Sequence, residues 1–211
     1  MHAMSTDIQQ HNTHHCLICA AQTHFFFTKT YPAYAGSPFP ETMQTDYWKC
    51  ERCGFVISKA QQEMSVAEWS SLNSDWHHYF ENNPTATGAN NQPPYADQGL
   101  ALQMLGKNGI VDLADTLDYA AGYGTLARFL RKYLSRDINI FDRYVRNNAS
   151  GLNYIAEDKL KKYQLVINSA MFEHVVTRSA LDEIDALVAD DGVLMLHTLI
   201  CERIPQDPDW F

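Results

Sequence analysis

Four cysteines in the N-terminal quarter are the residues whose type and spacing most directly predict chemistry. They form two C-x-x-C motifs, CLIC and CERC, with 30 residues between them. Each motif presents two sulfurs from one turn, and tetrahedral zinc takes four such ligands. The long gap is acceptable, because the entropic cost of loop closure grows only logarithmically with length. We predict a structural zinc site without an open catalytic position, formed by Cys16, Cys19, Cys50 and Cys53.

Other interpretations of the cysteines are weaker. A redox pair is disfavoured, because neither motif sits at a strand-to-helix turn of the thioredoxin kind. Ala20 and Gly54 follow the two motifs, where a small residue suits a tight turn. His14 and His15 are close enough in sequence to act as substitute ligands, but we expect them to be exposed tail residues. The fifth cysteine, Cys201, is expected to be a small apolar side chain.

A second chemical motif is the segment 116–129, TLDYAAGYGTLARF, which is typical of a strand, a glycine turn and the start of a helix. Small residues at alternate positions let the backbone approach a ligand closely, because no Cβ intervenes. The helix start would also direct free backbone N–H groups at that ligand. We predict a loop for a nucleotide-type cofactor, with the small residues Ala120, Gly122 and Gly124.

Two cofactor classes use such a loop, the dinucleotides and S-adenosylmethionine. The dinucleotide fingerprint G-x-G-x-x-G has a third glycine at the helix packing position, where this chain has Thr125. The pattern is closer to D-x-G-x-G-x-G, with Asp118 first and Ala120 replacing the first glycine. Asp142 ends the next predicted strand, where it can accept hydrogen bonds from both ribose hydroxyls; its alternative role is a helix cap. The absence of the third glycine favours S-adenosylmethionine.

The elements that must position these residues follow from hydrophobic periodicity. Ser65 and Glu68 predict a capping box for an amphipathic helix that ends near Pro84, and a polar linker continues to Pro94. Aromatic and turn residues between the cysteine motifs suggest short strands and loops. Beyond the linker, strands alternate with helices, which implies a parallel sheet with helices on both faces. We expect helices over 99–105, 125–134 and 179–189, and strands over 116–120, 138–142, 164–169 and 192–200.

The predicted fold class is α/β, with a doubly wound, mostly parallel, Rossmann-like sheet preceded by a small zinc ribbon. Few residues follow the last predicted strand, so we expect a sheet that is incomplete at its C-terminal end and a chain that is a fragment of a longer protein. The expected organisation is a disordered tail over 1–12, a zinc ribbon over 13–60, a helix and linker over 61–97, and a truncated cofactor-binding domain over 98–211.

Composition narrows the class of partner. The 211 residues are 45% hydrophobic and 19% charged, which is ordinary for a soluble globular protein. The formal net charge of −9 disfavours nucleic acid as the main partner, because phosphate binding needs a basic face. No apolar run approaches the roughly 18 residues that cross a bilayer, and the N-terminus lacks the apolar core of a signal peptide. We expect a cytoplasmic protein with reduced cysteines and no membrane partner.

Four motifs in sequence order, LDYAAGYGTLARFLRK, INIFD, YQLVINSAMFEHV and DDGVLMLHTLI, make residues 99–211 resemble a class I S-adenosylmethionine-dependent methyltransferase. The resemblance implies that the loop surrounds the methionine part of the cofactor and that Asp142 holds its ribose. An acid after the third strand often contacts adenine in this family, and Glu157 or Asp158 could match, but surface charge is the interpretation that we favour for both. The cofactor-binding residues implied are Asp118, Ala120, Gly122, Gly124, Asp142, Asn168, Ser169 and Ala170.

The N-terminal half is similar to the zinc-binding domain that precedes some sugar C-methyltransferases, with C-x-x-C, a long insertion and C-x-x-C-G-F. The large C-terminal domain of those enzymes has no counterpart in this sequence. The resemblance implies methyl transfer to a small molecule, such as a sugar or another metabolite. Two other functions stay open. Some rRNA-modifying members carry an N-terminal zinc knuckle, which would suit an RNA methyltransferase, and a degenerate fold would suit a non-catalytic zinc-ribbon interaction protein.

Methyl transfer from a sulfonium depends mainly on positioning and desolvation, and a general base is needed only if the nucleophile must lose a proton. His174 and His197 are the candidates: His174 follows the fourth predicted strand and His197 lies within the fifth. Ligands bind at the carboxyl ends of the strands in such sheets, so residues that follow a strand are well placed. The Glu173–His174 pair also occurs in the family as a structural, cofactor-side element. We take His174 as the candidate catalytic residue.

Overall fold

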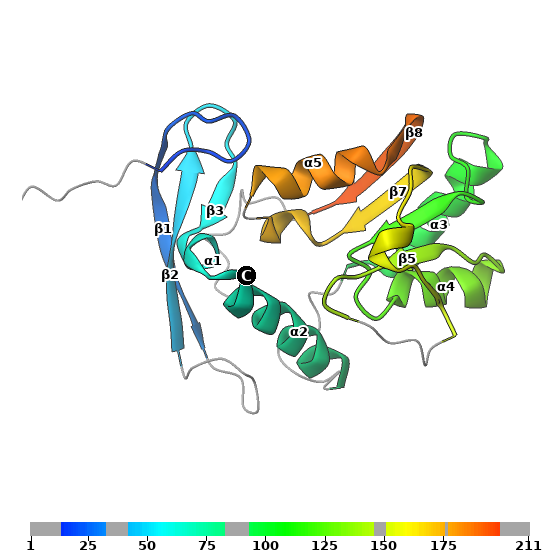
Figure 1. Ribbon diagram of the computed structural model, residues 1–211, viewed down its shortest axis with the longest axis horizontal. Coiled ribbons are helices and arrows are strands. Elements are labelled where there is room, and N and C mark those ends of the chain that lie inside the picture. The colour runs from blue at the N-terminus through cyan, green and yellow to red at the C-terminus, as the bar shows by residue number, and fades with distance from the viewer. Residues whose placement is uncertain (1–13, 33–41, 83–92, 146–150, 176, 199–211) are drawn as a thin grey trace, which may run out of the picture.

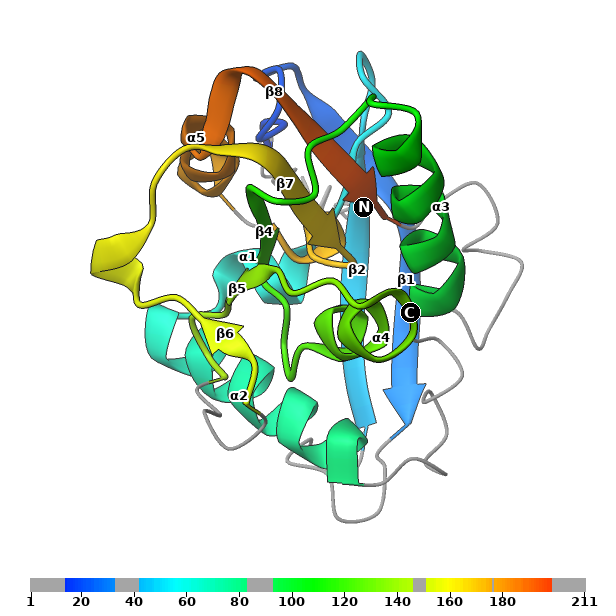
Figure 2. The same ribbon diagram turned by 90° about the vertical axis from the view of Figure 1, so that its right-hand side faces the viewer.

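The computed structural model describes residues 14–32, 42–82, 93–145, 151–175 and 177–198. Within these ranges the chain forms two sheets, a three-stranded one near the N-terminus and a five-stranded one in the second half. Two helices that follow the small sheet lie between it and the larger sheet (Figure 1). Figure 2 views the molecule from the side of the larger sheet. No helix among the described residues is both long and apolar enough to cross a membrane.

The small sheet is antiparallel and is longer than the sequence suggested. Strand β1 (Thr23–Pro32) pairs with β2 (Thr42–Cys50) along its whole length, and β3 (Val56–Ser58) pairs with the end of β2. Phenylalanine, threonine and tyrosine dominate β1, and these residues favour the extended conformation. The short strands and loops expected here are therefore a long hairpin, whose open end lies beside both cysteine motifs.

Two helices follow β3. Ser58 caps α1 (Lys59–Glu63), because its hydroxyl accepts a hydrogen bond from the Gln61 N–H. The predicted capping box of α2 (Val66–Asn82) is confirmed: Ser65 Oγ accepts from the Glu68 N–H at 3.2 Å, and Glu68 Oε2 accepts from the Ser65 N–H at 2.8 Å. The expected linker over 83–92 and the expected tail over 1–12 lie outside the described residues.

The large sheet is parallel throughout, as predicted, and its strand order is β6-β5-β4-β7-β8. The chain enters at the centre with β4, extends to one edge through β5 and β6, and then returns to place β7 on the other side of β4. The direction of winding therefore reverses between β4 and β7, and their outgoing loops diverge there. The strands are β4 (Thr116–Tyr119), β5 (Asn139–Phe141), β6 (Asn153–Tyr154), β7 (Tyr163–Ser169) and β8 (Val188–His197).

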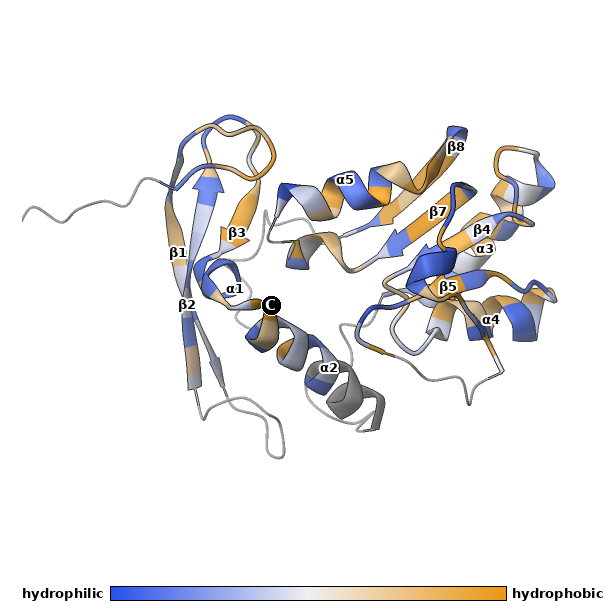
Figure 3. Ribbon diagram, viewed as in Figure 1, coloured by the Kyte–Doolittle hydropathy of each residue, from blue (hydrophilic) through white to orange (hydrophobic). Residues whose placement is uncertain are grey.

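Helices cover both faces of this sheet, which makes the fold α/β. Helices α3 (Tyr95–Lys107) and α4 (Thr125–Leu134) pack on one face through a core that includes Leu102 and Leu126, and α5 (Arg178–Ala186) packs on the other through Ile184. The middle of β7 is hydrophobic and its carboxyl end is polar (Figure 3). Two single-turn 3-10 helices, η3 (Glu157–Lys159) and η4 (Phe172–His174), follow β6 and β7. Strand β7 thus ends in two polar residues, Asn168 and Ser169, at the carboxyl edge of the sheet.

Two expectations about this sheet were wrong. The edge strand β6 was not predicted, because two residues are too few to show any periodicity. The helix expected over 179–189 ends at Ala186, and β8 begins at Val188 instead of residue 192. Val188 already pairs with Tyr163, and the next pair joins Val193 to Leu165, so the segment 189–192 forms a bulge. The turn-like sequence DDG belongs to that bulge and does not precede the strand.

Gly124 fixes how closely α4 approaches the sheet. It caps the helix in the left-handed conformation, with φ of +71°. A Cβ there would lie 2.5 Å from Leu152 Cδ1 and 2.9 Å from Ile140 Cδ1. Gly109 has a similar φ of +67° but no heavy atom within 4 Å of the Cβ position. The two glycines therefore separate the conformational cost of a side chain from its steric cost.

We predict that Gly109→Ala lowers the free energy of unfolding by about 1–2 kcal/mol, the cost of an L-residue in the left-handed region. Gly124→Ala should cost about 1–3 kcal/mol more, because its methyl group also overpacks the core. Urea denaturation of both variants measures the difference. Equal losses would contradict the steric part of this account.

Candidate functional site

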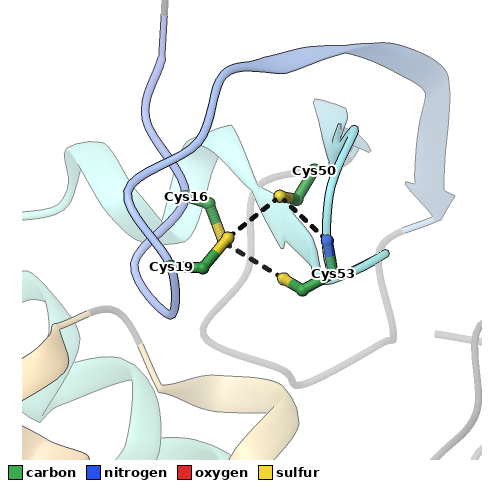
Figure 4. A group of neighbouring side chains, drawn as sticks. All are labelled: Cys16, Cys19, Cys50 and Cys53. Carbon is green, nitrogen blue, oxygen red and sulfur yellow. Dashed lines mark hydrogen bonds between the residues drawn. The ribbon is translucent and has the colours of Figure 1, made fainter.

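The two cysteine motifs converge on one point, as predicted (Figure 4). All four sulfurs lie within 4.8 Å of one another, and the Cys16–Cys53 and Cys19–Cys50 sulfur pairs are each 3.5 Å apart. A zinc–sulfur bond of about 2.3 Å in a tetrahedron places neighbouring sulfurs about 3.8 Å apart. The donor set and its spacing therefore fit a metal ion such as zinc, and all four cysteines are free thiols.

The two motifs have matching turns. In each, the first cysteine sulfur accepts a backbone N–H two residues on, from Ile18 and from Arg52 respectively. The residues that follow the motifs, Ala20 and Gly54, both adopt the left-handed conformation, which confirms the expectation of a tight turn. The N–H groups of Cys53 and Arg52 lower the pKa of the Cys50 thiol to about 6, whereas burial raises the pKa of the Cys53 thiol, so Cys50 is the thiol of this motif that ionises first.

Neither nearby histidine belongs to the sulfur cluster. His14 is half-buried, with its ring 4.6 Å from that of Trp48, so the expectation of an exposed tail residue is wrong for it. His15 is exposed as expected, and its Nδ1 lies 3.2 Å from the carbonyl oxygen of Ala20. Cys201 lies outside the described residues. The metal candidate is therefore the four-sulfur set alone among the described side chains.

The glycine turn follows β4 directly and uses left-handed residues at Ala120, Gly122 and Gly124, with φ of +62°, +54° and +71°. Ala120 stands where the motif has glycine, and its left-handed conformation costs an alanine more free energy than it would cost a glycine. The N–H of Gly122 donates to Asp142 Oδ2 at 2.8 Å, and that of Gly124 donates to the carbonyl oxygen of Ala121 at 2.9 Å. The Ala121 N–H donates to the carbonyl of Phe141. The turn therefore engages all three of these N–H groups itself, including that of Gly124 at the start of α4, where a free N–H was expected.

Asp142 joins the turns that follow β4 and β5. Besides the Gly122 N–H on Oδ2, its Oδ1 accepts the N–H groups of Tyr144 and Val145, each at 2.8 Å. These contacts resemble those of a capping residue, but no helix begins in the described residues 143–145, so they do not confirm the helix cap that was the alternative to ribose binding. A carboxylate has about four acceptor positions, so about one is left for a ligand hydroxyl.

Asp118 lies near this carboxylate and is 3% exposed. Burial, and secondarily the charge of Asp142, raise the pKa of Asp118 to about 7. The base of the turn therefore carries a second acid that loses its proton only near neutral pH. A cationic group brought to this point would favour the ionised form of Asp118.

The residues implied after the fourth strand occupy three different environments. Asn168 is fully buried and bridges strands, because its Nδ2 donates to the carbonyl oxygen of Tyr119 at 3.2 Å. Its Oδ1 has no hydrogen-bond partner within the described part of the chain. Ser169 Oγ lies 2.9 Å from Gln98 Nε2 and 3.4 Å from His197 Nδ1. Ala170 is left-handed, with φ of +56°. The structure thus brings Asn168, Ser169 and His197 to one sheet edge.

A cleft of about 610 Å³ lies beside Asp142, between the ends of β5 and β6. Its lining includes Tyr154 and both acids considered for adenine, Glu157 and Asp158. Arg143 also lines it and pairs with Glu157 at 2.9 Å and with Glu183 at 2.6 Å. Glu157 is therefore already engaged by a cation, whereas Asp158 pairs only with its exposed neighbour Lys159 among the ion pairs of the described residues.

His174 lies at the contact between the two halves of the molecule. Its Nδ1 is 3.5 Å from Nε2 of Gln61 on α1, and its ring is 6.3 Å from that of Trp69 on α2. The Trp69 side chain also shares a hydrogen bond with Tyr144, which follows β5. Helices α1 and α2 therefore reach the carboxyl edge of the large sheet (Figure 1).

The sequence interpretation missed several of these residues. Gln98 could have been found, because it lies one turn before Leu102 on the buried face of α3, where a polar side chain is unusual. Gln61, in the polar stretch KAQQE, carries no signal of its contact with a residue 113 positions away. Tyr144 and Arg143 follow Asp142 directly, but nothing in their spacing distinguishes them from surface residues.

The sequence matches no known protein-family model, and a comparison with curated proteins finds no significantly similar chain. Function must therefore be argued from the residues themselves.

We predict that the purified chain contains about one equivalent of zinc and that Cys50→Ser loses it, because a closed site needs all four sulfurs. Chelation should lower the thermal unfolding temperature of the wild type. Elemental analysis and thermal melts measure both effects. Cys201→Ser removes a cysteine that is not one of the four and serves as the control. Equal zinc content in both variants would exclude the four-sulfur site.

The raised pKa of Asp118 predicts a pH-dependent stability. Between its ordinary value of 3.8 and its folded value of about 7, the folded state binds more protons than the unfolded state. The contribution of Asp118 to stability therefore falls as pH rises through this window. Asp118→Asn resembles the neutral acid and should gain up to a few kcal/mol over wild type by pH 8, with the gain shrinking toward pH 4.

Urea denaturation across this pH range measures the difference in the free energy of unfolding between variant and wild type. The protonation of the cysteines affects both proteins equally, so it does not contribute to this difference. Asp185→Asn, at an exposed position on α5, is the matched control. Parallel stability curves for Asp118→Asn and wild type would contradict the assignment of a raised pKa.

Proposed function

We propose that the chain is an S-adenosylmethionine-dependent methyltransferase of the Rossmann-like class I type, acting on a small molecule. In the large sheet's own chain order, the strands run third, second, first, fourth, fifth. Such doubly wound sheets bind their ligands at the carboxyl edge, where the winding reverses. The glycine turn, Asp142 and Asn168 all lie at that edge, so the position of the cofactor loop supports the proposal.

The observation that carries the proposal is the charge at the base of the turn. Asp118 and Asp142 are both buried there, and the proximity of Asp142 contributes to the raised pKa of Asp118. A dinucleotide would bring its anionic pyrophosphate to this loop. S-adenosylmethionine instead carries a sulfonium and an ammonium group, which the Asp142 carboxylate attracts and which would favour the ionised form of Asp118. The acidic turn therefore favours the sulfonium cofactor over a dinucleotide.

The neighbouring side chains suit the other parts of that cofactor. The remaining acceptor position of Asp142 would take a ribose hydroxyl, and the cleft between β5 and β6 would take adenine, with Asp158 at its rim. Ala120, Gly122 and Gly124 would surround the methionine part, with Asn168, Ser169 and Ala170 beyond it. When bound, S-adenosylmethionine supplies an electrophilic methyl group on a good leaving group.

The chain's own residues would position the acceptor and exclude water. His174 and His197 both lie at the carboxyl edge, and His174 remains the candidate catalytic residue. The four-sulfur site would be structural, because a closed tetrahedral site leaves no coordination position for a substrate. The net charge of −9 supports a small-molecule acceptor over RNA.

Calorimetry of the zinc-loaded full chain with S-adenosylhomocysteine tests the proposal. We expect binding at one site, no binding of a nicotinamide dinucleotide, and about a 10- to 100-fold weaker affinity in Asp142→Asn, since it replaces a charged acceptor. Asp185→Asn should bind as the wild type does. Folding of each variant is checked by its thermal melt.

Failure of the wild type to bind S-adenosylhomocysteine would overturn the proposal and favour a non-catalytic interaction protein. Tight RNA binding with a steep salt dependence would instead favour an RNA acceptor.

A further inference from the structure

The metal-binding half of the chain contacts the candidate catalytic residue directly. Gln61 lies on α1, which follows the small sheet, and its carboxamide nitrogen is 3.5 Å from Nδ1 of His174. The ring of Trp69, on α2, approaches the ring of His174 from the same half of the molecule. The His174 backbone is fixed on its own side, because its N–H donates to the Met171 carbonyl at 2.8 Å. The imidazole is thus held between two parts of the chain that are far apart in sequence.

Gln61 itself is anchored to the sheet that carries the cysteines. Its backbone N–H donates to Ser58 Oγ, and Ser58 Oγ lies 3.1 Å from Thr45 Oγ1 on β2. Strand β2 ends at the metal-ligand candidate Cys50. A second contact joins the halves at the other cysteine motif, where Arg178 Nη1 donates to the carbonyl oxygen of Ile18 at 3.2 Å. The position of Gln61 is therefore tied to the metal-binding module.

The chemistry of the contact selects one form of the imidazole. Nε2 of Gln61 is the carboxamide atom that contacts the ring, and an amide nitrogen can only donate. When it donates to Nδ1 of His174, a neutral ring carries its proton on Nε2. We propose that Gln61 is a positioning residue that fixes His174 as the Nε2–H tautomer. Building on the proposed function, this means that neutral His174 carries a hydrogen-bond donor at Nε2 and is not poised as a base there.

The tautomer can be read without any ligand. Long-range ¹H–¹⁵N correlation spectra distinguish protonated from unprotonated ring nitrogens at a pH where the imidazole is neutral, and loss of a signal in His174→Gln assigns it. We expect the wild-type, zinc-loaded chain to carry the proton on Nε2. In Gln61→Glu, a carboxylate that only accepts should move the proton to Nδ1.

Gln62→Glu is the matched control, because it makes the same charge change at the next position of the same helix and should leave the tautomer on Nε2. A wild-type proton on Nδ1, or an unchanged tautomer in Gln61→Glu, overturns the proposal. The wild-type spectrum alone can overturn it if Gln61→Glu does not fold. Calorimetry of the same samples with S-adenosylhomocysteine separates the two proposals, because absent binding with a switched tautomer contradicts only the methyltransferase function.

Discussion

The carboxylate of Asp142 is the interaction on which the candidate site depends. It accepts three backbone N–H groups, one from the turn after β4 and two from the turn after β5. Charged acceptors make the stronger hydrogen bonds of this kind, so the two outgoing turns are held at a fixed separation. The cleft beside β5 and the glycine turn beside β4 both take their shape from this one side chain. Asp142 therefore stabilises the two turns even without a ligand, and any contact with a ligand would be an additional role.

A second bridge crosses the point where the winding reverses. Asn168 on β7 donates to the Tyr119 carbonyl on β4, so each neighbour of β4 is tied to its carboxyl end by a buried polar side chain. Burial of such groups is costly unless they are hydrogen-bonded, and Asp118 and the Oδ1 of Asn168 both retain part of that cost. These two groups therefore lower the folding stability at the edge of the sheet where we expect a ligand. Acids with perturbed pKa values often lie at such functional sites.

The sequence predicted what repeats locally and missed what depends on distant contacts. The bounds of α4 were predicted to the residue, because a glycine turn and a strong apolar stripe delimit it. The four cysteines were predicted because their spacing alone encodes their geometry. By contrast, β6 is an edge strand of two residues that exists only by pairing with β5, and its sequence has no periodicity. The Gln61–His174 contact could not be predicted either, because it depends on how α1 packs against the segment that follows β7. The position of Asp142 at the end of a strand was predicted, but its three backbone hydrogen bonds were not, because they depend on how the turns after β4 and β5 fold.

The contact between the small sheet and the parallel sheet bears on how such a chain can evolve or be recombined. Side chains from both halves make specific contacts across this interface. Gln61 and Trp69 contact His174, and Arg178 donates to the carbonyl of Ile18 in the first cysteine motif. A chimera that joins this α/β half to a foreign metal-binding module would keep both cores yet lose these contacts. A replacement module would therefore have to supply partners for positions 174 and 178, which Gln61, Trp69 and the first cysteine motif provide here.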